Sequence, residues 1–325
     1  MRGLLAIALA TMLIVTAGPI ATAQDYPNRP ITIIVPFAPG GAADVGSRLF
    51  GQKLSERLGK PVVIDNRPGA GTVIGANAGA KAAPDGYTLF MGGSASLAYN
   101  LTLRKSIPYD PVKDFVPLAH IAAIPFLLVV HPSLPVSSIP ELVKLAKDKP
   151  GELAFATSGP GSPAHLCSEL FRSMTDIKLT YVPYKGSPPA ITDFLANRVP
   201  AMFVEFPPSL PLIRDGRMRP LGVTSLTRVP ALPEVAPLAE VGVPGYQAGG
   251  WLMLAAPAET PKDIVAKLNA EFKAIANLPD VKKQFADLGL VGIDPPPVEE
   301  SRKFVVAEIE RWGKVMRDAG IAGSE

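Results

Sequence analysis

Two short glycine-containing segments carry the residues best suited to hold a small anion. Residues 36–44 read Pro-Phe-Ala-Pro-Gly-Gly-Ala-Ala-Asp, and residues 157–165 read Thr-Ser-Gly-Pro-Gly-Ser-Pro-Ala-His. Each segment follows an apolar β-type run and opens an amphipathic helix pattern. Glycine lets the backbone approach a ligand closely, and a helix N-terminus offers unpaired N–H groups to negative charge. The two segments therefore predict contacts to a small anion.

Each segment also fits a plainer interpretation, a tight strand-to-helix turn in which Asp44 only caps the helix or stabilises its first turn. The local pattern does not decide between the two. If both turns face one crevice, Ser158 and Ser162 can donate hydrogen bonds to a carboxylate. His165 lies one turn into the second helix. Two such turns converging on one crevice are typical of a small-anion binder.

The residue sets that catalysis or a cofactor would need do not occur in the sequence. No serine stands in a G-x-S-x-G elbow. The three histidines, His120, His131 and His165, have no i,i+4 or Cys companions, so no metal site is expected. The glycines of residues 69–75 imitate a dinucleotide fingerprint, but the final spacing is one residue too long. We expect no enzyme activity, no metal and no cofactor.

The first 23 residues have the pattern of a secretion signal. Arg2 precedes an apolar run over residues 4–15, and the small-x-small cleavage rule is met at Ala23, so the mature chain would begin at Gln24. The apolar run is shorter than the roughly 20 residues that span a bilayer. These features predict an exported protein, located in the periplasm, whose signal peptide occupies residues 1–23.

Length and charge narrow the class of protein further. A mature chain of this length exceeds the size at which a single core keeps growing, which favours two lobes. The formal net charge is +3, and the basic residues are scattered among acidic ones without a basic run, so we expect no nucleic-acid partner. The single cysteine, Cys167, lies among apolar helix positions and is expected to be a buried, inert thiol.

The order of apolar patterns predicts two α/β units with mainly parallel sheets covered on both faces. Predicted strands occupy residues 31–35, 61–65, 87–91, 126–130, 153–156, 179–182, 201–204, 221–224 and 249–256. The late helices suggest that the chain returns to its first unit. We therefore predict a first lobe over residues 24–123, a second over 124–225, and a return crossover with the C-terminal helices of the first lobe over 226–325. A double crossing makes a hinged cleft.

Several motifs, in this order, resemble those of the Bug family, the extracytoplasmic solute receptors of tripartite tricarboxylate transporters. The first is the Pro-Phe-x-Pro-Gly-Gly-x-x-Asp pattern of residues 36–44. Further matches are Asp-Asn-Arg-Pro-Gly-Ala-Gly at 65–71, Pro-Asp-Gly-Tyr-Thr at 84–88, Pro-Tyr-Asp-Pro at 108–111, Val-Pro-Tyr-Lys-Gly at 182–186, Pro-Ala-Glu-Thr-Pro at 257–261 and Trp-Gly-Lys at 312–314. The resemblance covers the whole mature chain.

The resemblance implies a type II periplasmic-binding-protein fold, an α/β fold with two Rossmann-like lobes joined by a double-strand hinge. It implies a small carboxylate ligand (a di- or tricarboxylate, an amino acid or an aromatic acid), held largely by main-chain N–H groups. The partners would be tripartite tricarboxylate-type membrane transporter subunits, and we expect a monomer. By position, the ligand-binding residues would be Phe37, Gly40, Gly41, Asp44, Ser94, Ala95, Ser158, Ser162, His165 and Glu205.

Three departures from the family pattern leave the identity of the ligand open. Val204 replaces a usual acid, and Glu205 stands where an amide is common. Pro160 removes one potential N–H donor from the second glycine turn. Thr72 and Val73 replace residues that are usually smaller or carry an amide. Two other functions stay possible at this point, a receptor for a membrane signalling system and a hydrolytic enzyme using the cleft.

Overall fold

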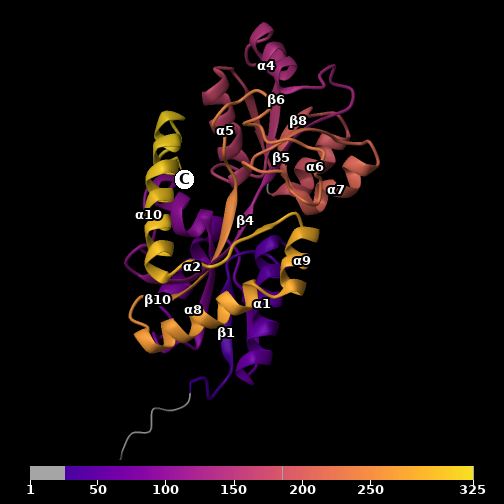
Figure 1. The fold of residues 1–325 in the computed structure, drawn as a ribbon. Helices are drawn as coiled ribbons and strands as arrows, with labels where there is room; N and C mark the ends of the chain where they lie inside the picture. The colour runs from indigo at the N-terminus through magenta and orange to yellow at the C-terminus, as the bar shows by residue number, and fades with distance from the viewer. Residues whose placement is uncertain (1–25, 185, 325) are drawn as a thin grey trace, which may run out of the picture.

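The computed structural model describes residues 26–184 and 186–324, and the predicted signal peptide lies outside them. Within the described residues the strands form two sheets flanked by helices (Figure 1). The first sheet contains β1 (Ile31–Val35), β2 (Val62–Asn66), β3 (Thr88–Gly93), β4 (Phe115–Ile124), β10 (Gly250–Pro257) and β11 (Val291–Gly292). The second contains β5 (Phe126–Val130), β6 (Ala154–Thr157), β7 (Thr180–Pro183), β8 (Ala201–Glu205) and β9 (Arg219–Val223). The predicted two-unit α/β architecture is confirmed.

The strand order is β11-β4-β10-β3-β1-β2 in the first sheet and β7-β6-β8-β5-β9 in the second. Both sheets are mixed, so the predicted mainly parallel arrangement is wrong. β10 runs antiparallel to β3 and β4, and β5 runs antiparallel to β8 and β9. These two strands enter each sheet from the other one. An entering strand begins at the edge where its neighbours end, which fixes its reversed direction.

Helices cover both faces of each sheet. Those packed on the first sheet are α1 (Ala42–Leu58), α2 (Val73–Ala80), the π-helical turn η2 (Ala95–Tyr99), α3 (Asn100–Leu103), α8 (Lys262–Ala276), α9 (Pro279–Asp287) and α10 (Val298–Asp318), and a short 3-10 turn, η1 (Ala70–Thr72), precedes α2. Those around the second are α4 (Ile139–Asp148), α5 (Pro163–Thr175), α6 (Ser187–Leu195) and α7 (Phe206–Arg214). Among these described residues, no helix combines the length and the apolar character that a membrane span requires.

Strand alternation divides the core of the first lobe into two layers. Ile33 and Val35 of β1 face α1, α8 and α9, whereas Ile34 between them faces the layer that contains α2 and α10. This second layer continues into the other sheet, because its cluster also includes Phe155 of β6 and Phe203 of β8. Figure 1 shows α10 running beside the first lobe toward α5. A shared apolar layer thus connects the two lobes.

The chain passes from the first sheet to the second between Ile124 and Phe126, and returns between Val223 and Gly250. Thr224 ties the two crossings together. Its hydroxyl accepts a hydrogen bond from the Phe126 N–H at 2.8 Å, and its carbonyl accepts one from the Ala248 N–H at 3.1 Å. These crossings form the two-strand hinge. The exact lobe boundaries, 24–123, 124–225 and 226–325, stay predictions.

Candidate ligand-binding site

The two sheets present the same kind of edge toward each other. β1 and β3 end where β4 leaves the first sheet, and β6 and β8 end where β5 enters the second. The carboxyl ends of the parallel strands in both lobes therefore lie around the hinge. In open α/β sheets, ligands bind outside these ends. The loops that follow β1, β3, β6 and β8 are the candidates for ligand contact.

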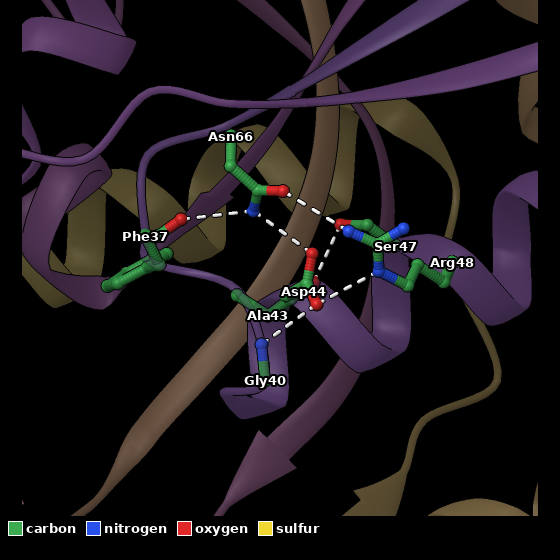
Figure 2. A network of polar contacts seen from close by, with 7 residues as sticks. All are labelled: Phe37, Gly40, Ala43, Asp44, Ser47, Arg48 and Asn66. Carbon is green, nitrogen blue, oxygen red and sulfur yellow. Dashed lines mark hydrogen bonds and ion pairs between the residues drawn. The ribbon is translucent and has the colours of Figure 1, made fainter.

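The first loop, residues 36–41, is held by a carboxylate from the helix that follows it. Asp44 is only 3% exposed. One carboxylate oxygen accepts hydrogen bonds from the Gly40 N–H at 2.9 Å and from Arg48 Nε at 3.0 Å, and the other accepts from Asn66 Nδ2 at 3.0 Å (Figure 2). Asn66 also donates to the Phe37 carbonyl at 3.0 Å. The loop is thus fixed to both α1 and β2.

Asp44 is an ionised group that is already satisfied by protein donors. Burial opposes ionisation, but the hydrogen bonds from Arg48, Gly40 and Asn66 outweigh it and lower the pKa of Asp44. These hydrogen bonds to Asp44 hold the loop in its shape. Gly40 has a φ of +90°, a left-handed conformation that glycine adopts without strain. Beyond this turn α1 begins, and the first N–H groups of a helix have no acceptor within it.

Ser94 and Ala95 follow β3 and lie beside the hinge. Ser94 is buried, and a Cβ atom placed on Gly250 would lie 3.3 Å from its hydroxyl. The Tyr99 hydroxyl donates to the carbonyl of Gly249 at 3.0 Å, which connects this turn to the returning strand. The π-helical turn formed here is a feature often found at functional sites. A movement of one lobe against the other would therefore change the surroundings of Ser94 and Ala95.

The second loop, residues 158–162, is held by a hydroxyl group and an imidazole ring. The Ser162 hydroxyl caps α5 by accepting from the His165 N–H at 3.2 Å. His165 Nδ1 accepts from the Gly161 N–H at 3.0 Å, so a neutral ring carries its proton on Nε2. That nitrogen lies 3.6 Å from the carboxylate of Glu169. Both ring nitrogens of His165 thus face protein groups, and the ring holds the backbone of the loop.

The second loop also touches the first lobe. Gly161 has a φ of +63°, and a Cβ atom there would lie 1.9 Å from a methyl carbon of Leu103 in α3. A second contact between the lobes joins Phe206 at the start of α7 to Gly289, where an added Cβ would lie 2.3 Å from Cβ of Phe206. The lobes are in contact at both places. Ser158 precedes Gly159 at the carboxyl end of β6, close to this junction.

Glu205 is the last residue of β8. It lies at the same edge of the second sheet as the second loop. Its side chain accepts a hydrogen bond from the Ser187 hydroxyl at 2.9 Å. Burial raises the pKa of Glu205, and this single side-chain bond only partly offsets the effect. A carboxyl group with a raised pKa can be protonated and donate a hydrogen bond. Glu205 therefore differs in character from Asp44, which is ionised and fully paired.

All ten sequence-predicted residues fall on the two facing edges. Phe37, Gly40, Gly41, Asp44, Ser94 and Ala95 lie on the first edge, and Ser158, Ser162, His165 and Glu205 lie on the second. The structure adds Asn66 and Ser187, which hold Asp44 and Glu205. Asn66 lies in the Asp-Asn-Arg-Pro motif, and Ser187 directly follows the Tyr-Lys-Gly motif. Their positions in or next to these motifs were the sequence feature that could have indicated both residues.

The groups that could do chemistry lie apart. His120, His131 and His165 occur in different parts of the fold, and over residues 26–184 and 186–324 no cluster of three or more His, Cys, Asp or Glu side chains suits a metal. Cys167 is buried, and burial raises the pKa of its thiol. A thiol with a raised pKa is a poor nucleophile. The remaining features of the site are backbone N–H groups, hydroxyls and one protonatable carboxyl group.

The model of the family described as tripartite tricarboxylate transporter family receptor matches residues 47–321. The chain belongs to this family. It is 41% identical to Protein BugT of Bordetella pertussis, over 97% of each chain. The solved structure described as R. palustris Rpa4515 with adipate is 40% identical, with a TM-score of 0.82 over 92% of this chain and 99% of that one. MatC from Rhodopseudomonas palustris with bound malate is 32% identical, with a TM-score of 0.76 over 89% and 99%.

These similarities agree with the two-sheet architecture. The protein is a solute-binding receptor of the tripartite tricarboxylate transporter family, with the fold of periplasmic binding proteins. The resemblance expected from the ordered motifs is confirmed. Receptors of this family are periplasmic solute-binding proteins.

Proposed function

We propose that this receptor captures one small carboxylate between its two lobes and passes it to the membrane subunits of a tripartite transporter. The observation that carries the proposal is the placement of the two glycine turns. Each follows a parallel strand, each opens a helix, and the two strand edges face each other across the hinge. Helix N-termini favour negative charge, so a carboxylate between them gains from both.

We assign direct contact to the N–H groups at the start of α1 and α5, and to the hydroxyls of Ser94 and Ser158. Pro163 at the start of α5 has no N–H, which leaves Ala164 as the first donor of that helix. Asp44 and His165 act through the loops they hold. A protonated Glu205 would donate a hydrogen bond to a ligand carboxylate, whereas an ionised one would repel it. This arrangement favours ligands whose second polar end can meet Glu205.

We further propose that the receptor acts without catalysis, as a monomer, after export and cleavage behind Ala23. His165, the histidine at the site, has both ring nitrogens directed to Gly161 and Glu169. A general base needs a free lone pair close to the reacting group. These contacts of His165 support binding without catalysis.

A thermal-shift screen of purified mature protein tests the proposal. The panel contains adipate and malate, with which two relatives are described, together with citrate and glutamate. The matched control for each acid is its uncharged amide. A ligand that binds only the native state raises the unfolding midpoint. We expect at least one acid to raise the midpoint and its amide to have no effect; a panel without any shift would contradict the proposal.

A further inference from the structure

A second cavity, of about 320 Å³, lies beside the hinge and contains none of the ten ligand-site residues. Its walls come from both crossings: Ile124 and Pro125 from the outgoing one, and Gly249 and Gly250 from the returning one. Further lining residues come from β4, from Trp251 of β10, from α10, from residues 291 and 293, and from the segment after β9. Small-molecule pockets begin at roughly 300 Å³, so this volume suits a ligand of about one ring.

Three aromatic rings form one wall of this hinge cavity. The His120 ring stacks on Phe304 at 4.4 Å between centroids, and Trp251 meets Phe304 edge-on at 5.3 Å. His120 is 7% exposed, and its Nε2 has no hydrogen-bond partner. Burial lowers the pKa of His120 to about 4, so the ring is neutral near pH 7. The wall therefore offers planar, uncharged surface with one unsatisfied nitrogen, and it suits a planar aromatic ring.

A guanidinium group supplies the positive charge of the hinge cavity. Arg311 donates to the carbonyl of Gln247 and lies 3.4 Å from Glu308. A guanidinium has five N–H donors, so these two contacts leave capacity for an anion. Glu308 is turned toward the indoles, because its other oxygen accepts from Trp251 Nε1 at 2.9 Å and from Trp312 Nε1 at 3.0 Å. The carboxylate is thus occupied on one side, whereas Arg311 is partly exposed.

We propose that the hinge cavity is a second binding site, which takes a small aromatic monocarboxylate. The ring lies against Trp251, Phe304 and His120, and the carboxylate meets Arg311. The site is separate from the one between the glycine turns, since Gly250 stands between them. Gly250 lines the hinge cavity, and a Cβ atom added to it would lie 3.3 Å from the hydroxyl of Ser94, a residue of the first site.

Occupancy of the hinge cavity is coupled to the position of the lobes. Ser225 and Thr227 follow the last strand of the second lobe, whereas Trp251 and Phe304 belong to the first. Any rotation about the hinge changes the distance between these walls. The cavity exists in a structure whose lobes touch at Gly161 and Phe206. A ligand in the hinge cavity therefore favours this arrangement and, by linkage, strengthens binding between the lobes.

The test is a titration of the mature protein with benzoate, followed by calorimetry and by tryptophan fluorescence. The protein has two tryptophans, Trp251 and Trp312, and both bond to Glu308 at this cavity. We expect saturable binding with a change in fluorescence, and no response to benzamide. Arg311→Gln should weaken benzoate binding by about tenfold or more, since hydrogen bonds to charged groups are the stronger ones. Lys314→Gln, on the exposed side of α10, is the matched control and should leave binding unchanged.

Absence of a saturable fluorescence change, or equal benzoate affinity in wild type and Arg311→Gln, would overturn the hinge site. A second arm measures adipate affinity with and without saturating benzoate, and we expect it to be several-fold tighter with benzoate. Equal adipate affinities would overturn the coupling. Failure of adipate and every other panel acid to bind between the lobes contradicts the proposed function instead, because the benzoate arm does not depend on it.

Discussion

The two glycine turns have the same place in their lobes but are held by different forces. In the first turn, the ionised and buried carboxylate of Asp44 accepts three hydrogen bonds, from Gly40, Arg48 and Asn66. In the second, a hydroxyl cap and an imidazole, Ser162 and His165, hold the backbone. The first turn is fixed within its own lobe, whereas the second also touches Leu103 of the other lobe.

This difference separates two ways of controlling affinity. A change at the first turn acts on the shape of one half of the site and should depend on pH, because its brace is a charge. A change at the second turn acts on the docking of the two lobes, and the effect of removing its Ser162 cap should not depend on acid pH. Four sets of substitutions test this distinction.

The largest effect is expected for Gly161→Ala. The left-handed conformation costs an alanine about 1–2 kcal/mol, and the added methyl would lie 1.9 Å from Leu103. Overpacking adds about 1–3 kcal/mol, so we expect a loss of about 2–5 kcal/mol in the free energy of unfolding. Carboxylate affinity should fall more than tenfold because the lobes cannot dock. Urea denaturation and calorimetry measure the two quantities.

Gly40→Ala is the matched control for this variant. Its φ is also left-handed, but nothing lies within 4 Å of an added Cβ. It should lose only the conformational cost of about 1–2 kcal/mol. The double variant Gly161→Ala with Leu103→Ala should recover affinity relative to the single variant. If Gly40→Ala and Gly161→Ala weaken binding equally, contact between the lobes does not matter for affinity.

Asp44→Asn is expected to rank second. It removes the charge from a buried network, and a partner left unsatisfied costs about 1–3 kcal/mol. Because the pKa of Asp44 is lowered in the folded state, its stabilisation is present above the ordinary carboxyl pKa of about 4 and is lost as pH falls through the lower folded value. Wild type should therefore lose its advantage over the variant in acid.

The measurement is the free energy of unfolding of both proteins between pH 2 and pH 7. If the two plots of unfolding free energy against pH are parallel over that range, the charge of Asp44 does not stabilise the first turn. Calorimetry at pH 7 adds a separate test of function. Unchanged affinity of the Asp44→Asn variant for every carboxylate of the panel would show that the first turn does not contribute to the site.

Ser162→Ala should have a smaller effect, of about 1 kcal/mol, typical of a lost helix cap. The difference between wild type and this variant should stay constant from pH 2 to pH 5, because Ser162 carries no charge. Thermal unfolding at several pH values measures it. The matched control is Ser138→Ala, which removes the equivalent cap of α4 far from the ligand site and should leave affinity unchanged.

Glu205→Gln should have the smallest effect on stability, with the opposite sign. The raised pKa of Glu205 means that the folded protein binds its proton more tightly. The wild-type contribution is full below the ordinary carboxyl pKa and is lost as pH rises through the raised value. The two proteins should thus be equally stable near pH 4, and the variant more stable at pH 7. A wild type that gains stability relative to the variant between pH 4 and pH 7 would contradict this assignment.

Much of the fold follows from local patterns in the sequence. The apolar runs of β1 and β5 have the predicted bounds, and the turns at residues 36–44 and 157–165 join strand to helix as expected. The pattern does not indicate β4. Pro117 and His120 interrupt its apolar character, and proline in a strand normally argues against one. In the structure, the pairing of β4 with β10 has a register irregularity next to Pro117, which accommodates the residue.

The direction of β5 and β10 depends on contacts between distant segments, so alternating strand and helix patterns could not give it. The roles of Asp44, Ser162 and His165 were ambiguous for a different reason. A carboxylate, a hydroxyl or an imidazole next to a helix start can bind a ligand or its own backbone with the same atoms. Only the positions of Gly40, Asn66 and Gly161 relative to these side chains distinguish the two.

The central claim is that one small carboxylate binds between the two turns and needs both. Calorimetric titration of wild type, Gly161→Ala and Asp44→Asn with the best acid of the thermal-shift panel tests it most directly. We predict one ligand per chain in the wild type, with affinity reduced in both variants and most in Gly161→Ala. Wild-type binding that neither variant weakens would contradict a site shared between the two turns.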